Sequence, residues 1–439
     1  MEKHNYGCLI EQDEIYDVVH YDEYDFDFIR KSDNFNSIDI CPKNDYLKCK
    51  MLDGSDILIY ARNKFHVSGK MWHFSPGLYI RGGINEDNLK GIEFTGGILS
   101  NLFIPNSIET RHSEGGTVLN YKDDSIVYTV QIGQKEIEIR VASQISESLG
   151  VSGIDIKNNN VALDVIFKDG LKLDDIRTVI QAVNEMCQFM TSRKNIKFDS
   201  MKVLECYGIE DESSTLPGAD IFYKSSYTCF TEKDWIQSLS FSDLGEALPK
   251  LFRAMYLKGK EKTDYFTLDY LAKDDNEDIW FDERRIKSIC TAVESEAERQ
   301  GFVAETNDEF EELKKKTKSL INEYKTKEWM SDRTYNLLAS NIRNWDFSAY
   351  DKYIRLFRKY EEYIVLSEVY RGSAVAFEDA IGKIISYRNS STHGTYKQVT
   401  AELAETAYSL MLLVYCSRLD YLGISKDILW EKIRNRAFA

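Results

Sequence analysis

The stretch Tyr387-Arg388-Asn389-Ser390-Ser391-Thr392-His393-Gly394 separates two segments whose apolar residues recur at helical spacing. The segment before it carries Phe377, Ile381, Ile384 and Ile385, and the one after it carries Leu403, Ala407, Leu410, Met411 and Val414. Thr395 and Gln398 have the spacing of a capping box, so the second helix is expected to begin there. We therefore expect Arg388 to close one helix, and a break over residues 389–394 to let Arg388 and His393 converge.

The residue types in this stretch suit the cleavage of a phosphodiester. His393 is the only histidine after His112, and it follows Arg388 by five positions. An imidazole titrates near neutral pH, so it can accept or donate a proton during a reaction. A guanidinium stays charged, and its fork of donors matches the geometry of a phosphate. This pair needs no metal ion for such a reaction.

Arg388, Asn389 and His393 match, position by position, the motif of the HEPN ribonucleases, in which Arg and His are separated by four to six residues. The layout, with a β-rich part followed by helices and a late motif, resembles the ApeA-type HEPN proteins of bacterial antiphage defence. One departure concerns HEPN toxins that carry a tyrosine two residues after the histidine. Here Tyr396 lies three residues after His393, so control through that tyrosine is not carried over.

The resemblance implies a metal-independent endoribonuclease that leaves a 2′,3′-cyclic phosphate. Arg388 and His393 would be catalytic, and Asn389 would orient the phosphate or the imidazole. Lys383 would add positive field, and Glu378 or its neighbour Asp379 would hold Arg388. No cofactor and no metal ion are expected.

The resemblance also implies partners. A single motif supplies one histidine, so two chains are expected to pair through the helical domain and form a composite site. The apolar positions of the two motif helices, which exceed what one bundle needs, are expected to supply that interface. The substrate would be cellular RNA, with transfer RNA as the simplest choice, although no residue identifies it. The N-terminal domain would be a sensor or regulator that recognises a phage-derived trigger or holds the dimer inactive.

Glycine and proline divide the chain into a β-rich part and a helical part. All five prolines lie at or before Pro249, and 18 of the 24 glycines lie before residue 251. The fold class expected is α+β and multidomain, with a β-rich, sandwich-like domain over residues 1–234, a helical connector over 235–282 and an all-α HEPN bundle over 283–439. Strands are expected at 56–60, 77–81, 91–94, 117–121, 125–131, 136–141, 161–167, 196–206 and 221–227. Helices are expected at 173–192, 235–257, 260–272, 282–300, 308–324, 332–342, 347–370 and 425–436.

Charge and composition limit the possible functions. The net charge of −16 excludes a general nucleic-acid binder. Residues 251–439 hold 30 basic and 32 acidic side chains, and the window 381–400 holds three basic residues and no acid. That distribution suits brief contact with one RNA. The polar N-terminus, the absence of a membrane-length apolar run and the eight scattered cysteines indicate a cytoplasmic protein that does not contact a membrane.

Several other patterns have simpler explanations. The acidic run at 274–278 lacks the glycine and glutamate that an EF-hand needs. His66, His73 and His112 lack zinc-type spacing, so we expect them to be structural. Arg388 could merely stabilise a helix C-terminus, with His393 as a turn residue. The alternative function is therefore a non-catalytic HEPN-type scaffold, or a binding module with a ligand-recognising β-sandwich.

Overall fold

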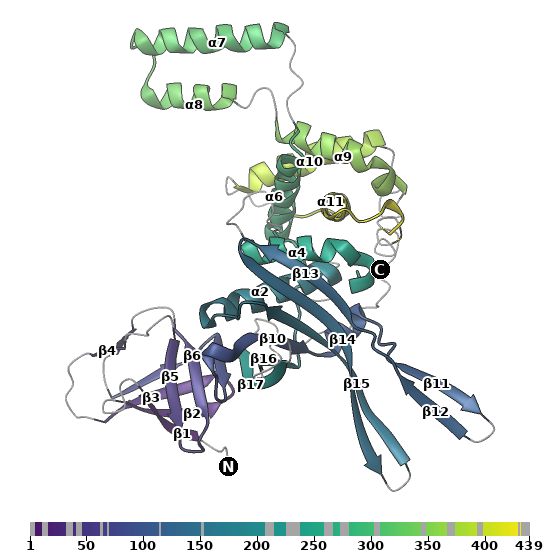
Figure 1. Ribbon diagram of the computed structural model, residues 1–439. Helices are drawn as coiled ribbons and strands as arrows, with labels where there is room; N and C mark the ends of the chain where they lie inside the picture. The colour runs from purple at the N-terminus through teal and green to yellow at the C-terminus, as the bar shows by residue number, and fades with distance from the viewer. Residues whose placement is uncertain are drawn as a thin grey trace. The chain divides into compact units, whose positions relative to one another are not determined.

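The computed structural model of the 439-residue chain contains two compact units, Met1–Tyr265 and Phe266–Ala439. The residues that it describes are 5–10, 16–31, 38–40, 46–61, 65–67, 70–113, 116–150, 153–206, 215–224, 238–258, 267–272, 281–302, 308–343, 348–366, 374–392, 398–428 and 431. The first unit is built on antiparallel strands and the second is all-helical (Figure 1). The expected α+β arrangement, with the strands before the helices, is confirmed.

A single antiparallel sheet of 13 described strands forms the first unit, in the order β13-β14-β15-β10-β16-β17-β9-β6-β5-β1-β2-β3-β8. These strands are β1 (Asn5–Leu9), β2 (Tyr16–Asp22), β3 (Asp25–Arg30), β5 (Tyr46–Met51), β6 (Asp56–Tyr60), β8 (Met71–Phe74), β9 (Leu78–Arg81), β10 (Leu89–Thr95), β13 (Ile126–Ile132), β14 (Lys135–Gly150), β15 (Gly153–Phe167), β16 (Ser200–Cys206) and β17 (Thr215–Tyr223). Two further pairs are β4 (Ile38–Ile40) with β7 (Phe65–Val67), and β11 (Ile108–Ser113) with β12 (Gly116–Tyr121).

The sequence predicts a sandwich-like domain, and the structure shows that its main strands form one continuous hydrogen-bonded sheet. Strand β9 pairs with β17 on one side and with β6 on the other, so its hydrogen bonds join the two halves. The half that contains β1, β2, β3, β5 and β6 encloses a core of its own. Phe26, Phe28, Cys49 and Ile59 in that core are fully buried.

Helices cover one face of the other half of the sheet. Helix α2 (Leu173–Thr191) buries an apolar stripe that includes Ile176, Ile180 and Val183, and it packs against α4 (Leu248–Leu257). Helix α4 also contacts β13, and the Tyr128 hydroxyl donates to the Phe241 carbonyl oxygen at 3.1 Å. The alternating burial of β13 fits a strand with one covered face.

The connector expected over residues 235–282 is divided between the units. The helices α3 (Phe241–Leu244) and α4, with the short 3₁₀ turn η4 (Gly245–Ala247) between them, belong to the first unit because their apolar side chains pack on the sheet and on α2. The described residues 267–272 belong to the second unit and form no helix, which corrects the helix expected at 260–272. Two short elements of the first unit remain, η2 (Glu86–Asn88) and α1 (Gly97–Leu102).

The second unit is organised around helix α6 (Glu283–Arg299), which contacts α9 (Ala349–Leu366), α10 (Ala374–Thr392) and α11 (Ala401–Leu422). Asp282 caps α6 by accepting from the Arg285 amide at 2.7 Å. Glu296 of α6 and Arg418 of α11 are fully buried and form an ion pair at 2.8 Å. Arg418 also donates to the Tyr270 hydroxyl at 3.0 Å, so the segment before α6 is tied to the bundle.

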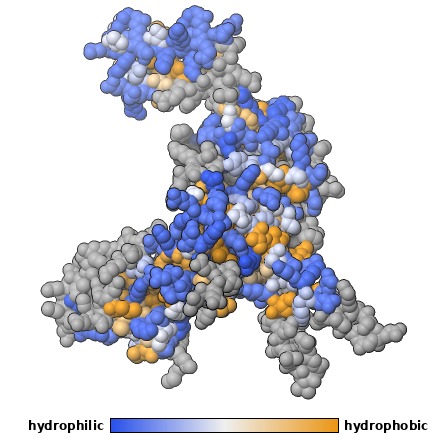
Figure 2. All heavy atoms as spheres, in the orientation of Figure 1, coloured by the Kyte–Doolittle hydropathy of each residue, from blue (hydrophilic) through white to orange (hydrophobic). Residues whose placement is uncertain are grey.

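Helices α7 (Asp308–Thr326) and α8 (Asp332–Arg343) form a hairpin whose main contacts are with each other. The surface of this hairpin is mostly hydrophilic, with hydrophobic atoms between the two helices (Figure 2). Tyr335 donates to the Asn322 side-chain oxygen at 3.0 Å across the pair. No helix among the described residues is long and apolar enough to cross a membrane.

A row of charged residues crosses the sheet of the first unit. The strand register places six side chains opposite one another in turn, from β14 to β9. They are Arg140, Asp164, Glu93, Lys202, Asp220 and Arg81. Two carboxylates, those of Asp164 and Glu93, are therefore neighbours. Burial, together with the nearby Glu93 and Glu138 charges, raises the pKa of Asp164 to about 7, and the positive charge of Arg140 opposes this shift.

We predict that Asp164→Asn stabilises the first unit at pH 8 and has much less effect at pH 5. The folded pKa of about 7 lies above the ordinary value of 3.8. The unfolded chain therefore loses this proton first, and the stability of the folded state falls as pH rises from about 4 to about 7. Each pKa unit corresponds to about 1.4 kcal/mol, so urea unfolding at the two pH values can resolve the difference. An equal effect of the substitution at both pH values would contradict this assignment.

Candidate functional site

The motif helix α10 continues four residues beyond Arg388, to Thr392. This corrects the expectation that Arg388 ends the helix and that a break begins at Asn389. The Ser390 hydroxyl donates to the Ser386 carbonyl oxygen at 2.9 Å, so a serine in this polar stretch bonds within the helix. His393 directly follows the last residue of α10 in the sequence and lies outside the described residues.

The next helix, α11, begins later than the capping pattern predicts. Thr400 is its N-cap, and the Thr400 hydroxyl accepts from the Leu403 amide at 3.3 Å. Thr395, the N-cap expected from the sequence, lies outside the described residues, as does Tyr396. The segment between the two motif helices therefore runs from His393 to Thr400, longer at its C-terminal end than the sequence pattern predicts.

Glu294 of α6 holds Arg388. The Arg388 guanidinium donates through Nη2 to Glu294 Oε1 at 2.5 Å and through Nη1 to the side-chain oxygen of Asn389 at 3.2 Å. The side chains of Arg388 and Glu294 are both about a quarter exposed, at 28% and 26%. One edge of the guanidinium is thus fixed by a carboxylate on a neighbouring helix, and Asn389 steadies it from its own helix.

Beneath this pair the helix interface is largely uncharged. Cys290 lies one turn before Glu294 on α6 and is fully buried, and the Tyr353 hydroxyl of α9 donates to the Cys290 carbonyl oxygen at 3.0 Å. Burial raises the pKa of the Cys290 thiol to about 11, so the thiol is neutral. Burial also raises the pKa of Glu294, and the positive charges of Arg388 and Lys352 oppose that shift.

Glu378 does not hold Arg388, contrary to the expected role. Its carboxylate forms an ion pair with Arg358 of α9 instead. Helix geometry explains the difference, because residues 378 and 388 are ten apart on α10 and lie nearly three turns from each other. Asp379, the other carboxylate considered, lines a groove between α10 and α11.

Lys383 is also paired, with Glu402 near the start of α11 at 2.5 Å. Both side chains are more than half exposed, so the pair is weak. The window 381–400 contains no acid in the sequence, yet the tertiary structure brings one carboxylate to each of its two described cations. The local positive charge that the sequence predicts is therefore offset by α6 and α11. Lys383 also lines the groove, of about 580 Å³, to which Ser386, Tyr387, Thr400 and Leu403 contribute.

Helix α11 is covered within a single chain. From Thr406 onwards nearly every residue of this helix is buried, on all of its faces. Of the apolar positions expected to supply a dimer interface, most are buried within one chain: Ala407, Leu410 and Val414 on α11, and Phe377, Ile381 and Ile384 on α10. Among the described residues, α11 offers no uncovered apolar face for a second copy.

Among the described residues no group of three or more His, Cys, Asp or Glu side chains could hold a metal ion. His73 bonds to the Tyr21 hydroxyl at 2.6 Å and to Asp27 at 3.1 Å, on an exposed part of the sheet. His66 and His112 lie on β7 and β11. The acidic run at 274–278 lies outside the described residues.

Comparison with known proteins found no match: no family model, no curated protein and no solved structure matches the chain. The resemblance to HEPN ribonucleases accordingly rests on the motif and on the order of the strand-rich and helical parts alone. Sequence reasoning missed Glu294, although a signal was available. This carboxylate is one turn from the buried Cys290 and three residues from the buried Ala297, beside the apolar stripe of α6.

We predict that Glu294→Ala increases the reactivity of Arg388 toward phenylglyoxal several-fold, because the carboxylate no longer engages the guanidinium. The measurement is the fraction of modified Arg388 in the peptide that contains it, by mass spectrometry over time. Glu361→Ala is the matched control, since Glu361 pairs with Arg358 at 3.0 Å on an exposed surface. Equal modification of Arg388 in both variants would show that Glu294 does not restrain it.

Proposed function

We propose that the helical unit is a metal-independent endoribonuclease of the HEPN type, with Arg388 and His393 as its catalytic residues. The observation that supports this proposal most is how the Arg388 side chain is held. Its guanidinium is held between Glu294 and Asn389 near the end of α10, and the single histidine of the helical part follows that helix in the sequence. A positioned arginine beside a candidate acid–base group is what this reaction requires.

The proposed reaction is attack of an RNA 2′-hydroxyl on the adjacent phosphorus. The 2′ proton passes to a base, the bond from phosphorus to the 5′ oxygen breaks, and an acid protonates that oxygen. The products are a 2′,3′-cyclic phosphate and a 5′-hydroxyl. Arg388 stabilises the charge that develops on the phosphorane oxygens, and Asn389 orients either the phosphate or the imidazole. Lys383, with Glu402 beside it, contributes at most a screened field.

One histidine cannot readily serve as base and acid in the same turnover, so we propose that two chains pair and contribute a motif each. This part of the proposal rests on the chemistry, because the apolar face of α11 is covered within one chain. The substrate is cellular RNA, with transfer RNA as the first to test. In this scheme the protein acts in antiphage defence by abortive infection, and the β-rich unit senses a phage-derived trigger.

A second function is favoured by a specific observation. Each described cation of the motif region is paired with a carboxylate from another helix, Arg388 with Glu294 and Lys383 with Glu402. Ion pairs of this kind also join helices in proteins without activity. The alternative is thus a non-catalytic scaffold or binding module, in which Arg388 connects α10 to α6.

We predict that Arg388→Ala and His393→Ala each lower RNA cleavage by about 10²–10³-fold, the usual loss for one group that stabilises a transition state. The assay is incubation of purified protein with total cellular RNA, followed by sequencing of the fragment ends. Arg333→Ala on α8 is the matched control, because its side chain is exposed and lies outside the motif.

The two variants also test the composite site when they are mixed. Partial recovery of cleavage in the mixture would show that Arg388 of one chain acts with His393 of the other. A stable monomer that cleaves at the full rate would exclude the dimer. Wild-type cleavage by either variant alone, with an unchanged melting curve, would show that the substituted residue is not catalytic. Absence of cleavage by the wild-type protein would favour the scaffold.

We predict that cleavage persists in EDTA and that the upstream fragments end in 2′,3′-cyclic phosphates. The reason is that the proposed roles of base, acid and charge stabiliser are all taken by side chains. Resistance of the fragment ends to polyadenylation before, but not after, removal of the phosphate would identify them. Fragments with 3′-hydroxyl ends would exclude attack by the 2′-hydroxyl. A strict requirement for added Mg²⁺ would contradict the metal-independent acid–base scheme.

A further inference from the structure

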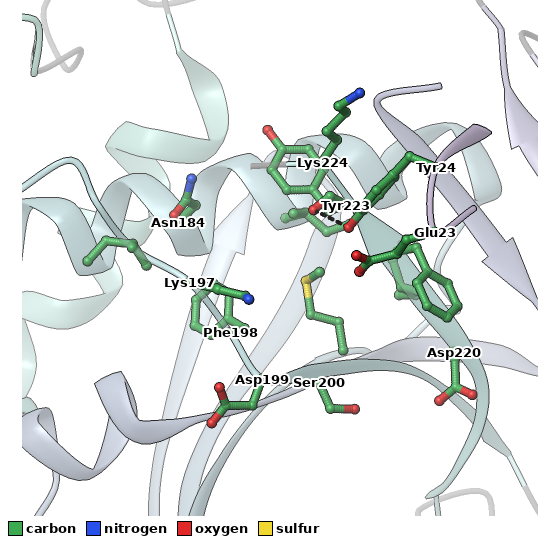
Figure 3. Close-up of a pocket in the computed structure, with 15 residues that line it drawn as sticks. Glu23, Tyr24, Asn184, Lys197, Phe198, Asp199, Ser200, Asp220, Tyr223 and Lys224 are labelled. Carbon is green, nitrogen blue, oxygen red and sulfur yellow. Dashed lines mark hydrogen bonds between the residues drawn. The ribbon is translucent and has the colours of Figure 1, made fainter. Parts of the chain in front are cut away.

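The first unit contains a cavity of about 600 Å³ that the proposed nuclease does not use. Segments far apart in the sequence line it: the turn between β2 and β3, helix α2, the segment that leads into β16, and the end of β17 (Figure 3). This volume is in the range of small-molecule sites. All of its lining residues belong to the same compact unit.

The walls of the cavity are anchored in the core. Phe222 stacks on the buried Tyr79 with ring centroids 4.5 Å apart, and Phe198 lies against the buried Phe94 at 5.0 Å. The Tyr24 hydroxyl donates to the Tyr223 carbonyl oxygen at 3.1 Å, which joins the β2–β3 turn to β17. The cavity is thus formed by side chains whose positions are fixed before any ligand binds.

Two opposite charges face each other across this cavity. The Lys197 ammonium points into it from one wall and the Glu23 carboxylate points into it from the other (Figure 3). They do not form an ion pair with each other, and neither group has a hydrogen-bond or ion-pair partner within the part of the chain that is described. The lining also includes apolar side chains, among them Ile180 and Met201, and the amide of Asn184.

The other charged groups in the lining are already engaged or add negative charge. Lys224 donates to the Ser75 hydroxyl at 2.8 Å, and Asp199 accepts from the Gly97 amide at 3.1 Å. Asp220 is a further carboxylate in the lining. Three carboxylates against two ammonium groups disfavour a phosphate ligand, and the inward Lys197 disfavours a purely cationic one.

We propose that this cavity binds a small zwitterion of the amino-acid or dipeptide class. Lys197 binds the ligand carboxylate, Glu23 binds the ligand ammonium group, and an apolar ligand side chain packs on Ile180 and Met201. Such a ligand pairs with both charges and contacts the apolar part of the lining. The proposal concerns the first unit alone and does not depend on Arg388.

Binding is tested by calorimetry on the full chain with L-leucine, L-phenylalanine and the dipeptide Leu-Leu. We expect at least one of these to bind with a Kd below about 1 mM. N-acetyl-L-leucine and L-leucinamide, which lack the ammonium group and the carboxylate respectively, should each bind at least about tenfold more weakly than L-leucine. The same affinities are expected in Arg388→Ala, so the outcome is independent of the nuclease.

Variants locate the site. Lys197→Met and Glu23→Gln should each weaken binding by about tenfold or more. Lys172→Met should leave it unchanged, because Lys172 is exposed at the start of α2 and does not line the cavity. Since Lys197 and Glu23 are exposed, both substitutions should leave the fold intact. The proposal is overturned if none of the three probes binds, if both variants bind them as wild type does, or if adenosine monophosphate binds more tightly than the zwitterions.

Discussion

The buried ion pair between Glu296 and Arg418 is the interaction on which the helical unit depends. Both side chains are fully buried, so each charge has lost its water and relies on its partner. Arg299 and the Ser417 hydroxyl add contacts to Glu296 Oε2, at 3.2 and 3.3 Å. A carboxylate in this position is stable only when its donors are in place, so the pair fixes how α6 lies against α11.

The position of α6 then determines the candidate site. Glu294 and Glu296 are two residues apart on one helix, so their side chains point in directions about 200° apart. One faces α11 and the other faces α10, where it meets Arg388. The guanidinium is oriented from outside its own helix, and a phosphate would have to compete with Glu294 or share the guanidinium with it. The same geometry is compatible with a catalytic role of Arg388 and with a structural one. The Arg388→Ala variant therefore tests both functions.

The strand-rich unit is governed by a different constraint, the continuity of its sheet. Strand β9 is hydrogen-bonded on both sides, so it joins two halves of one sheet. One half carries α2 and α4, and the other half has its own core. That continuity places the turn at Glu23 near the start of β16 and forms the cavity between them. It also aligns the charged row in which Asp164 lies beside Glu93.

The sequence by itself determined the order of the two structural classes and most of the helices. Periodic apolar residues predicted α2 and α6 nearly to their ends and the existence of α10, since such stripes must be buried on one side. The sequence also predicted that the adjacent residues Arg388 and Asn389 lie near the end of a helix. The sequence did not predict strands β1 to β3, because frequent aspartates and tyrosines obscure the alternation of apolar and polar residues. Only the tertiary structure decided which carboxylate meets which cation: Glu294 rather than Glu378 holds Arg388, and Glu402 holds Lys383. Those pairings join residues 94 and 19 positions apart, and no local pattern encodes contacts that depend on how helices pack.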